Sequence, residues 1–234
     1  MSRIPDLSPA HAPPFVRLSR RFARKKVREL TGRETGTMLA PLDAYARAPR
    51  LLFGIAMLED ATARLHRMPE RLKLLAELKA ATLTQCEYCI DIGSRIAHRG
   101  GISEAQLLAL PHYRDSELFD DDEKLVIDYA VGMSSTPVSV PDELFDRLRA
   151  RFDEAQLVEL TNVIALENMR GRFNLALGIG SSGFTEGMVC AVPDSVPAPV
   201  GANVGASPRT PAAGASGPVA SADGAEAGIS AAIR

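Results

Sequence analysis

Two cysteines in residues 84–94, Thr-Gln-Cys-Glu-Tyr-Cys-Ile-Asp-Ile-Gly-Ser, are spaced so that they could work as a redox pair. Thr84 and Glu87 have the spacing of a capping box, which predicts that a helix begins here and that Cys86 and Cys89 lie one turn apart. The unpaired N–H groups at a helix N-terminus favour a thiolate and lower the pKa of a thiol. The segment therefore predicts a dithiol that converts reversibly into a disulfide.

Two other interpretations of this pair are open. Cys-x-x-Cys is also half of a zinc site, but tetrahedral zinc needs two more ligands, usually from a second close pair. The third cysteine, Cys190, stands alone, and the four histidines are scattered: His11, His66, His98 and His112. The other alternative is two inert buried cysteines. No metal site and no cofactor is predicted, and Cys190 is expected to take no part in the dithiol cycle.

The elements that must hold the pair are predicted to be helices. Apolar residues recur with helical spacing in residues 50–67 and 70–83, and the second of these stretches leads directly to the cysteines. Beyond the cysteines, Asp91 and Arg95 are expected to form an i, i+4 ion pair on the outer face of their helix. Gly100 and Gly101 are expected to end that helix.

Capping boxes predict two further helices downstream. Ser103 with Gln106 opens a short helix, and Asp153 with Gln156 opens the longest one, which extends to about residue 177. The long helix is apolar around much of its girth, so part of it is expected to be covered by another subunit. Five polar residues interrupt its apolar surface: Glu167, Asn168, Arg170, Arg172 and Asn174. No convincing alternation typical of a half-buried strand is found, so the predicted fold class is all-α.

Composition and charge narrow the classes of function. The 234-residue chain is 46% hydrophobic and 24% charged, as is ordinary for a globular protein. It has no apolar run of ~20 residues and no secretory signal, and with three cysteines it is expected in the reducing cytoplasm. Its net charge is −2, unevenly distributed. Residues 1–35 are basic, with nine Lys or Arg against three acids, and the rest of the chain is acidic. Nucleic-acid binding is therefore not expected.

The chain is predicted to divide into three parts. Residues 1–40 form a basic arm and linker, whose helix at residues 15–30 is expected to pack on the core or on a partner subunit, with an anionic membrane surface as the alternative. Residues 41–180 form the helical domain. Residues 181–234 form an extension that is expected to be disordered from about residue 193, because Ala, Gly, Pro, Ser and Val dominate it.

The cysteine segment, followed by Gly101, Ile102 and Ser103, resembles the carboxymuconolactone decarboxylase superfamily, and more narrowly its alkylhydroperoxidase AhpD-like branch. The similarity covers about residues 41–180. It implies an all-helical fold that assembles into a homo-oligomer, a trimer or hexamer. It also implies a dithiol that reduces a small hydroperoxide and is recharged by a dithiol electron donor. Position by position, Cys89 matches the family's peroxidatic cysteine and Cys86 the resolving one.

Two positions depart from the pattern of that family. The family's catalytic histidine would fall at Gly93 and its glutamate at Leu74. Glu77 lies three residues beyond Leu74, about 60° around a helix, and is the predicted substitute for the glutamate, with Glu167 on the long helix as an alternative. Nothing local replaces the histidine, so a partner subunit is the other expected source of a catalytic group.

The leading hypothesis is a thiol-dependent antioxidant enzyme of peroxiredoxin-type activity. A carboxymuconolactone decarboxylase-like enzyme is one alternative, although that chemistry needs a pocket for carboxylates and no dithiol. A non-catalytic redox-sensing or assembly module is another, favoured by the missing histidine. The position at the helix start slightly favours Cys86 as the activated thiol. The resemblance favours Cys89, which is the preferred nucleophile.

Overall fold

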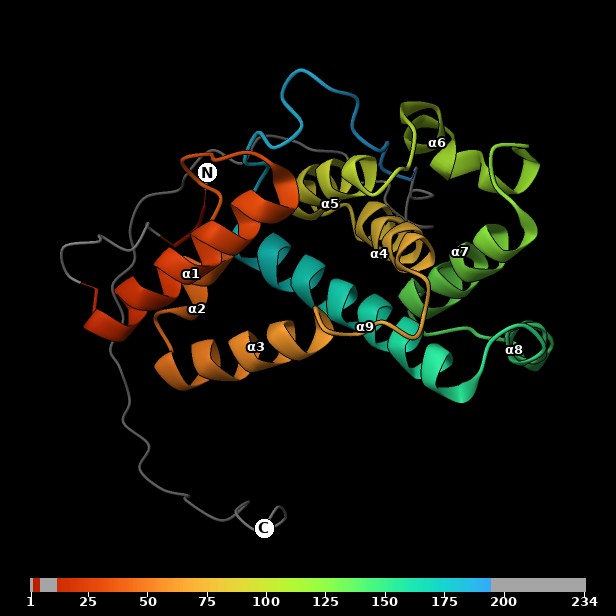
Figure 1. Ribbon diagram of the computed structural model, residues 1–234, viewed down its shortest axis with the longest axis horizontal. Helices are drawn as coiled ribbons and strands as arrows, with labels where there is room; N and C mark the ends of the chain where they lie inside the picture. The colour runs from red at the N-terminus through yellow and green to blue at the C-terminus, as the bar shows by residue number, and fades with distance from the viewer. Residues whose placement is uncertain (1, 5–11, 195–234) are drawn as a thin grey trace, which may run out of the picture. The chain divides into compact units, whose positions relative to one another are not determined.

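The computed structural model describes residues 2–4 and 12–194, and every structural statement below concerns these residues. They contain nine α-helices and one 3₁₀-helix and no strand, which confirms the predicted all-α class (Figure 1). The elements, in chain order, are α1 (Pro14–Thr31), α2 (Ala40–Tyr45), α3 (Pro49–Thr62), α4 (Glu70–Thr84), α5 (Glu87–Arg99), α6 (Glu104–Ala109), η1 (Leu110–Asp115), α7 (Asp121–Ser134), α8 (Asp142–Arg149) and α9 (Glu154–Leu177). None of these helices is long and apolar enough to cross a membrane.

Helix α4 lies at the centre of the fold because it is buried on opposite faces. Leu75 and Leu78 on one face pack into a core that also contains Cys86 and Cys89 at the start of α5. Ala76 and Ala80 on the other face pack into a second core, shared with α7, α8 and α9. A helix that is apolar around its girth must be covered on all sides. The cysteine pair of α5 thus packs against the most enclosed helix of the described chain.

Helix α9 is the longest element and lies between α3 on one side and α4 and α7 on the other (Figure 1). Its predicted capping box is confirmed: Gln156 N donates to Asp153 Oδ1 at 2.8 Å, and Asp153 N donates to Gln156 Oε1 at 2.9 Å. The helix ends at Gly178, which has a left-handed conformation. The predicted box at Ser103 and Gln106 is also present. Local side-chain signals therefore set these helix starts correctly.

The helix expected over residues 50–67 is shorter than predicted. Helix α3 ends at Thr62, and residues 63–69 form a loop that leads into α4. The buried carboxylate of Glu159 on α9 accepts hydrogen bonds from the backbone N–H groups of His66, Arg67 and Met68, at 3.3, 2.9 and 2.9 Å. These N–H groups are satisfied by a distant side chain, so the loop does not need helical hydrogen bonds.

The basic N-terminal segment is helical, as predicted, and spans Pro14–Thr31 as α1. It buries Val16, and Arg20 forms an ion pair with Asp43. Four large apolar side chains of α1 are exposed to solvent: Phe15, Leu18, Phe22 and Leu30. Helix α3 is also poorly covered, since Leu52 is its one buried residue. The first three helices therefore leave a large apolar surface exposed in the described chain.

Candidate active site

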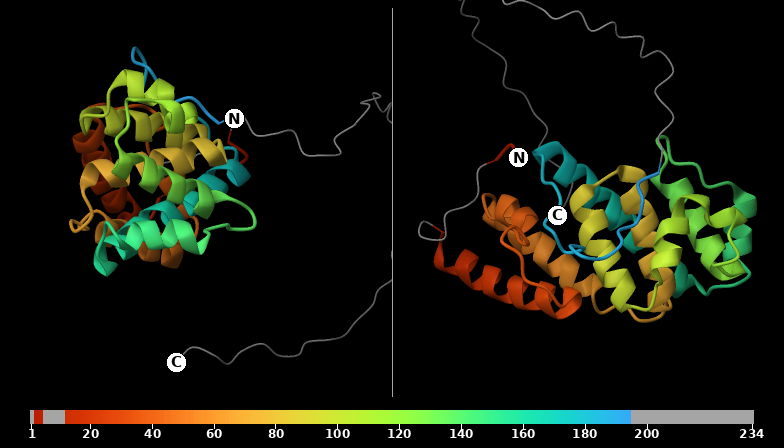
Figure 2. Two further views of the ribbon diagram at one scale, coloured as in Figure 1. Left: turned by 90° about the vertical axis from the view of Figure 1, so that its right-hand side faces the viewer. Right: turned by 90° about the horizontal axis from the view of Figure 1, so that it is seen from above.

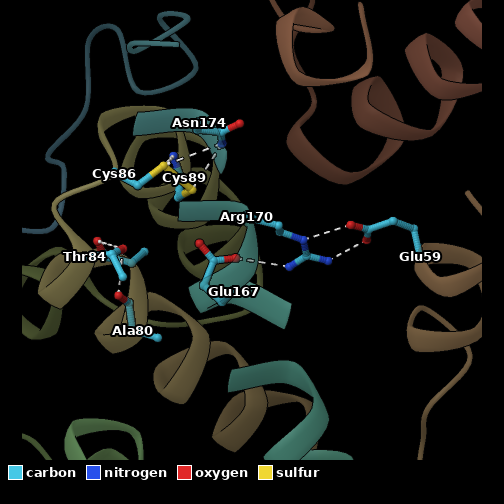
Figure 3. Close-up of a disulfide and its surroundings, with 9 residues drawn as sticks. Glu59, Ala80, Thr84, Cys86, Cys89, Glu167, Arg170 and Asn174 are labelled. Carbon is cyan, nitrogen blue, oxygen red and sulfur yellow. Dashed lines mark hydrogen bonds and ion pairs between the residues drawn. A yellow bond between two sulfur atoms is a disulfide. The ribbon is translucent and has the colours of Figure 1, made fainter. Parts of the chain in front are cut away.

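Cys86 and Cys89 are joined as a disulfide at the start of α5 (Figure 3). Their Cα atoms are 5.2 Å apart, within the usual range for a disulfide. Cys86 is the N-cap residue of α5, and its Sγ accepts a hydrogen bond from the backbone N–H of Cys89 at 3.2 Å. The structure therefore brings the two predicted site cysteines together at a helix N-terminus, where negative charge on sulfur is stabilised.

The predicted Thr84 cap is wrong. Thr84 is the last residue of α4, and its hydroxyl donates to the carbonyl oxygens of Ala80 and Ala81 at 3.0 and 3.1 Å. The helical conformation is interrupted at the next residue, Gln85, which is left-handed with φ 57°. Cys86 is consequently the N-cap itself and not the second residue of the helix. A non-glycine residue in this conformation is uncommon, which explains why the break was misplaced.

Helix α9 reaches the cysteines through a close helix contact. Gly171 of α9 lies against Thr84, and a Cβ atom at Gly171 would be 2.7 Å from the Thr84 hydroxyl. The absence of a side chain there allows α9 to approach the end of α4 closely. One turn further along α9, Asn174 lies beside the disulfide, with its Nδ2 atom 3.6 Å from Cys86 Sγ and 3.5 Å from Cys89 Sγ (Figure 3).

Both sulfur atoms are shielded from solvent. Cys86 is 0% exposed and Cys89 is 5% exposed. The surface hollow along α7 and the hollow along α8 and α9 include neither residue. Cys89 is the slightly more exposed residue of the two.

Three carboxylates from α3, α4 and α9 surround Arg170 of α9, near the disulfide. Arg170 is one turn before Asn174, and its guanidinium pairs with Glu59 at 2.5 Å and Glu167 at 3.1 Å (Figure 3). It also pairs with Glu77 at 3.3 Å. One guanidinium cannot neutralise three carboxylates. The cluster therefore favours a bound proton on one of its acids.

Burial decides which acids hold that proton. It raises the pKa of Glu77 to about 7, although the charge of Arg170 acts in the opposite direction. It also raises the pKa of Glu167, whose Oε1 atom is buried and has no hydrogen-bond partner in the described residues. Glu77 is bound to Arg170, and no hydrogen bond connects it to either sulfur. The pKa of Glu77, the predicted base, thus lies near neutral pH, but its carboxylate does not contact either sulfur.

The two positions that depart from the family pattern are packing positions. A Cβ atom at Gly93 would be 3.3 Å from the Cδ1 atom of Leu78 on α4, so even an alanine there would require the Leu78 side chain to shift slightly. Leu74 is buried in the same core and fills the space next to Gly100. Neither position can offer a titratable group. The residue missed by sequence reasoning is Asn174, one of the polar interruptions of the long helix.

The segment that follows α9, residues 179–194, is here named the strap, and it crosses α5 (blue, Figure 2). The buried carboxylate of Asp91 holds it. Asp91 accepts six hydrogen bonds of 2.7–3.1 Å from the strap, and the donors are the hydroxyls of Ser181 and Thr185 and the backbone N–H groups of Ser182, Gly183, Phe184 and Thr185. The far end is fixed where Asp194 pairs with the buried Lys79 at 2.8 Å.

The predicted surface pair of Asp91 and Arg95 is therefore wrong. Asp91 is buried under the strap, and Arg95 donates from Nε to the carbonyl of Thr31 at 2.7 Å. Burial by itself would raise the pKa of Asp91, but the hydrogen bonds from Thr185 and Ser181 overcome it and lower that pKa below its usual value. Asp91 and Arg95 have the spacing of a helical ion pair, but strap residues some ninety positions away give Asp91 more hydrogen bonds.

Residues 181–194 of the predicted extension are thus ordered parts of this domain. The predicted disorder from about residue 193 falls almost wholly on residues 195–234, which lie outside the described residues. The domain boundaries at residues 40 and 180 stay predictions.

Cys190 is a free thiol in the strap, half-buried against α5. Its Sγ is 3.5 Å from the hydroxyl of Ser94 and 3.8 Å from the carbonyl of Ile90. On a helix these two residues lie on a different face from Cys89. This placement supports the prediction that Cys190 stays outside the dithiol cycle. Among the described residues, no group of three or more His, Cys, Asp or Glu side chains could hold a metal ion.

Known proteins resemble this chain in sequence and in fold. YnjA, an uncharacterized protein of Escherichia coli, is 36% identical over 165 residues, which cover 69% of this chain and 87% of YnjA. No protein-family model matches the sequence. Among solved structures, the debrominase Bmp8 matches with a TM-score of 0.64 and 20% identity, over 76% of this chain and 91% of Bmp8. A peroxidase-related protein with an AhpD core from Ralstonia eutropha matches with a TM-score of 0.63 and 16% identity, over 78% of this chain and 94% of that protein. The predicted AhpD-like fold is thereby confirmed.

The strap contact predicts a pH dependence of stability. Asp91→Asn should lower the free energy of unfolding at pH 7 by about 2–3 kcal/mol, because it removes charge-assisted hydrogen bonds. Since the folded pKa of Asp91 lies below the unfolded value of about 3.9, its contribution is complete above that pH and is lost as the pH falls through the folded pKa. Denaturant titrations from about pH 7 to pH 2 should therefore show the two proteins converging in acid.

The matched control is Asp60→Asn, which breaks an exposed ion pair with Arg64 and should have little effect. An Asp91→Asn protein with wild-type stability at pH 7 would show that the strap contact adds nothing to the fold.

Proposed function

This chain belongs to the same family as YnjA and has the AhpD-like fold, and we propose that it is a thiol-dependent enzyme that reduces small hydroperoxides. The observation that carries the proposal is the Cys86–Cys89 disulfide at the start of α5, with backbone and amide N–H groups directed at its sulfurs. A sulfur pair in this setting can form a stable thiolate and can close and open a disulfide. The proposed antioxidant activity requires both steps.

The proposed cycle begins with the thiolate of Cys89, which attacks the terminal oxygen of a hydroperoxide. A sulfur–oxygen bond forms, the oxygen–oxygen bond breaks, and the alkoxide leaves and takes up a proton. The thiolate of Cys86 then attacks the sulfenic sulfur of Cys89, which releases water after protonation and gives the disulfide. A dithiol donor reduces that disulfide by two exchange steps and becomes a disulfide itself.

The roles of the two sulfurs follow from their surroundings. Cys89 is the more exposed residue of the pair, which supports its role as the one that meets the hydroperoxide and the donor. Cys86 Sγ accepts a hydrogen bond from Cys89 N and lies within reach of the Asn174 amide. Because these hydrogen bonds stabilise negative charge on sulfur, Cys86 is a good leaving thiolate when the dithiol reductant attacks Cys89. The geometry thus favours Cys89 as the attacking residue and Cys86 as the resolving one.

Glu77 is proposed as the proton acceptor of the cycle. Its pKa of about 7 suits a group that exchanges protons near neutral pH. Because it is held by Arg170 and does not contact a sulfur, it would act through water. Glu167, with its unpartnered buried oxygen and raised pKa, is the second acid of the same cluster.

Other chemistries are weaker fits to this site. A decarboxylase needs a free cation for its substrate carboxylate, whereas the buried Lys79 is already paired with Asp194. Bmp8 is a debrominase, and a cysteine-to-alanine variant of it has been crystallised with 2,3,4-tribromopyrrole. Halide removal by a thiolate is therefore a second candidate for this chain. A redox sensor would cycle its cysteines without catalytic turnover.

We expect the enzyme to act in the cytoplasm, where dithiol donors keep such a pair reduced. We also expect it to form a homo-oligomer, a trimer or hexamer, and helix α3 is the proposed contact surface. Leu51, Phe53 and Met57 of α3 are 53%, 70% and 57% exposed. A cluster of apolar side chains on one helix is typical of a protein–protein contact.

The function is tested with the reduced full-length chain, an alkyl hydroperoxide and a dithiol donor such as dithiothreitol. We expect hydroperoxide consumption that Cys89→Ser lowers by more than about 10³-fold and that Cys190→Ser leaves unchanged. Cys86→Ser should accumulate a sulfenic acid that dimedone traps.

Bromide release from 2,3,4-tribromopyrrole is measured in parallel. Bromide release without hydroperoxide consumption would replace the proposed activity with debromination. Reversible disulfide formation without turnover of either compound would favour a sensor. Sulfenic acid in Cys89→Ser and not in Cys86→Ser would reverse the roles of the sulfurs.

Glu77→Gln should change the pH profile of thiol oxidation. In the wild type the rate should rise as the pH passes about 7, because Glu77 must lose its proton before it can accept one. The variant should be about 10-fold slower above that pH and should lack the inflection. Stopped-flow measurements of the oxidation rate across the neutral range test this. Glu117→Gln, at an exposed acid that is not among the charges acting on Glu77, is the control. An unchanged profile in Glu77→Gln would remove it from the mechanism.

The proposed contact surface is tested by light scattering. Phe53→Asp combined with Met57→Asp should lower the molecular mass in solution, because charges on the surface cannot be buried between subunits. Val138→Asp, at an equally exposed residue in the loop after α7, should leave the mass unchanged. A monomeric wild type at micromolar concentration would contradict the predicted oligomer.

A further inference from the structure

The side-chain amide of Asn174 lies beside both sulfurs, and the cycle above uses only its N–H side, as a hydrogen-bond donor to Cys86. Asn174 is 3% exposed, and its Nδ2 atom lies within 3.6 Å of both sulfurs. Its Oδ1 atom is buried and has no hydrogen-bond partner in the described residues. Figure 3 shows the amide beside the disulfide, with the oxygen directed away from the sulfurs.

A buried carbonyl oxygen without a donor costs stability, because it loses its hydrogen bond to water and gains none. This oxygen lacks a donor in the disulfide form, in which neither sulfur carries a hydrogen. In the dithiol form each sulfur can carry one, and a thiol is a hydrogen-bond donor. Reduction therefore creates a possible partner for Oδ1 within the reach of a rotation of the amide.

The N–H side of the amide has the complementary property. A thiolate accepts hydrogen bonds, and bonds to a charged acceptor are about twice as strong as neutral ones. In a reduced pair that holds one thiolate and one thiol, the amide can donate to the first and accept from the second. A disulfide offers only weak acceptor atoms to the same amide. The reduced state thus gains more from Asn174 than the oxidised state does.

From these contacts we propose that Asn174 is a catalytic residue of the cysteine pair, whose amide stabilises the thiolate–thiol form against the disulfide. The proposal deepens the proposed function and rests on it only for the identity of the substrate. In the cycle, Asn174 supports the thiolate that attacks the hydroperoxide. It also makes the disulfide easier to reduce by the donor, since stabilisation of the reduced form makes a dithiol pair more oxidising.

The chain contains a matched control on the same helix. Asn168 is also a buried asparagine of α9, and its Oδ1 is also unpartnered. Its Nδ2 donates to the hydroxyl of Ser134 and to the carbonyl of Ile164, and no hydrogen bond joins it to either sulfur. Replacement of either asparagine by leucine removes a buried amide, but only the loss of the Asn174 amide should affect the sulfurs.

The experiment uses full-length wild type, Asn174→Leu, Asn174→Asp and Asn168→Leu, with folding checked by circular dichroism. Two quantities are measured without any hydroperoxide. The first is the dithiol–disulfide equilibrium in glutathione buffers, read by thiol alkylation of the Cys86–Cys89 pair. The second is the pKa of the thiols, read from the ultraviolet absorbance of the thiolate. Neither readout depends on catalysis.

We expect Asn174→Leu to shift the equilibrium about tenfold toward the disulfide, which is about 30 mV, and to raise the lower thiol pKa by about one unit. Asn174→Asp should raise that pKa further, because its carboxylate repels the thiolate. Asn168→Leu should change neither quantity.

Unchanged values in folded Asn174→Leu, or a lower thiol pKa in Asn174→Asp, would overturn the proposal. If Asn174→Leu does not fold, the nearly isosteric Asn174→Asp decides alone. Shifts in these values together with a wild type that consumes no hydroperoxide would support the role of Asn174 and reject the proposed function.

Discussion

The contact between Gly171 of α9 and Thr84 at the end of α4 is the constraint on which the site depends. Because Gly171 has no side chain, α9 lies close to the junction between α4 and α5. The distance between α9 and this junction determines whether Asn174, one turn further along α9, can reach the sulfurs, because its side chain is short. The same approach brings Arg170 next to Glu77. One helix contact thus sets both the polar partner of the sulfurs and the charge balance beside them.

The charge balance follows from burial rather than from any single pair. Arg170 interacts with three carboxylates from three helices, α3, α4 and α9. In water each acid would ionise well below neutral pH, but removal from solvent disfavours a second and third negative charge. Glu77 and Glu167 are therefore the groups with raised pKa values. The cluster can therefore take up or release a proton near the Cys86–Cys89 disulfide.

Much of the fold could be predicted from the sequence because its signals are local. The capping boxes at Ser103 and Asp153 act over three residues and were found at the predicted positions. The break before Cys86 was misplaced by two residues, because a plausible Thr84–Glu87 box stands next to a glutamine that adopts an unusual backbone conformation.

Long-range contacts account for the rest of the site. The partners of Asp91 lie in residues 181–185, and no spacing rule relates them to α5. Asn174 had a signal, since a polar residue in an otherwise apolar helix requires a buried partner. That partner was the cysteine pair, which only the packing of α9 against the α4–α5 junction could reveal.

The strap gives the protein a built-in reporter of its own local opening. Cys190 is half-buried between the strap and α5, and in the oxidised protein it is the one free thiol. Its rate of alkylation should therefore rise when the strap is detached, because the contact with α5 covers part of the thiol. A simple thiol reagent can thus compare strap release between conditions in the intact protein.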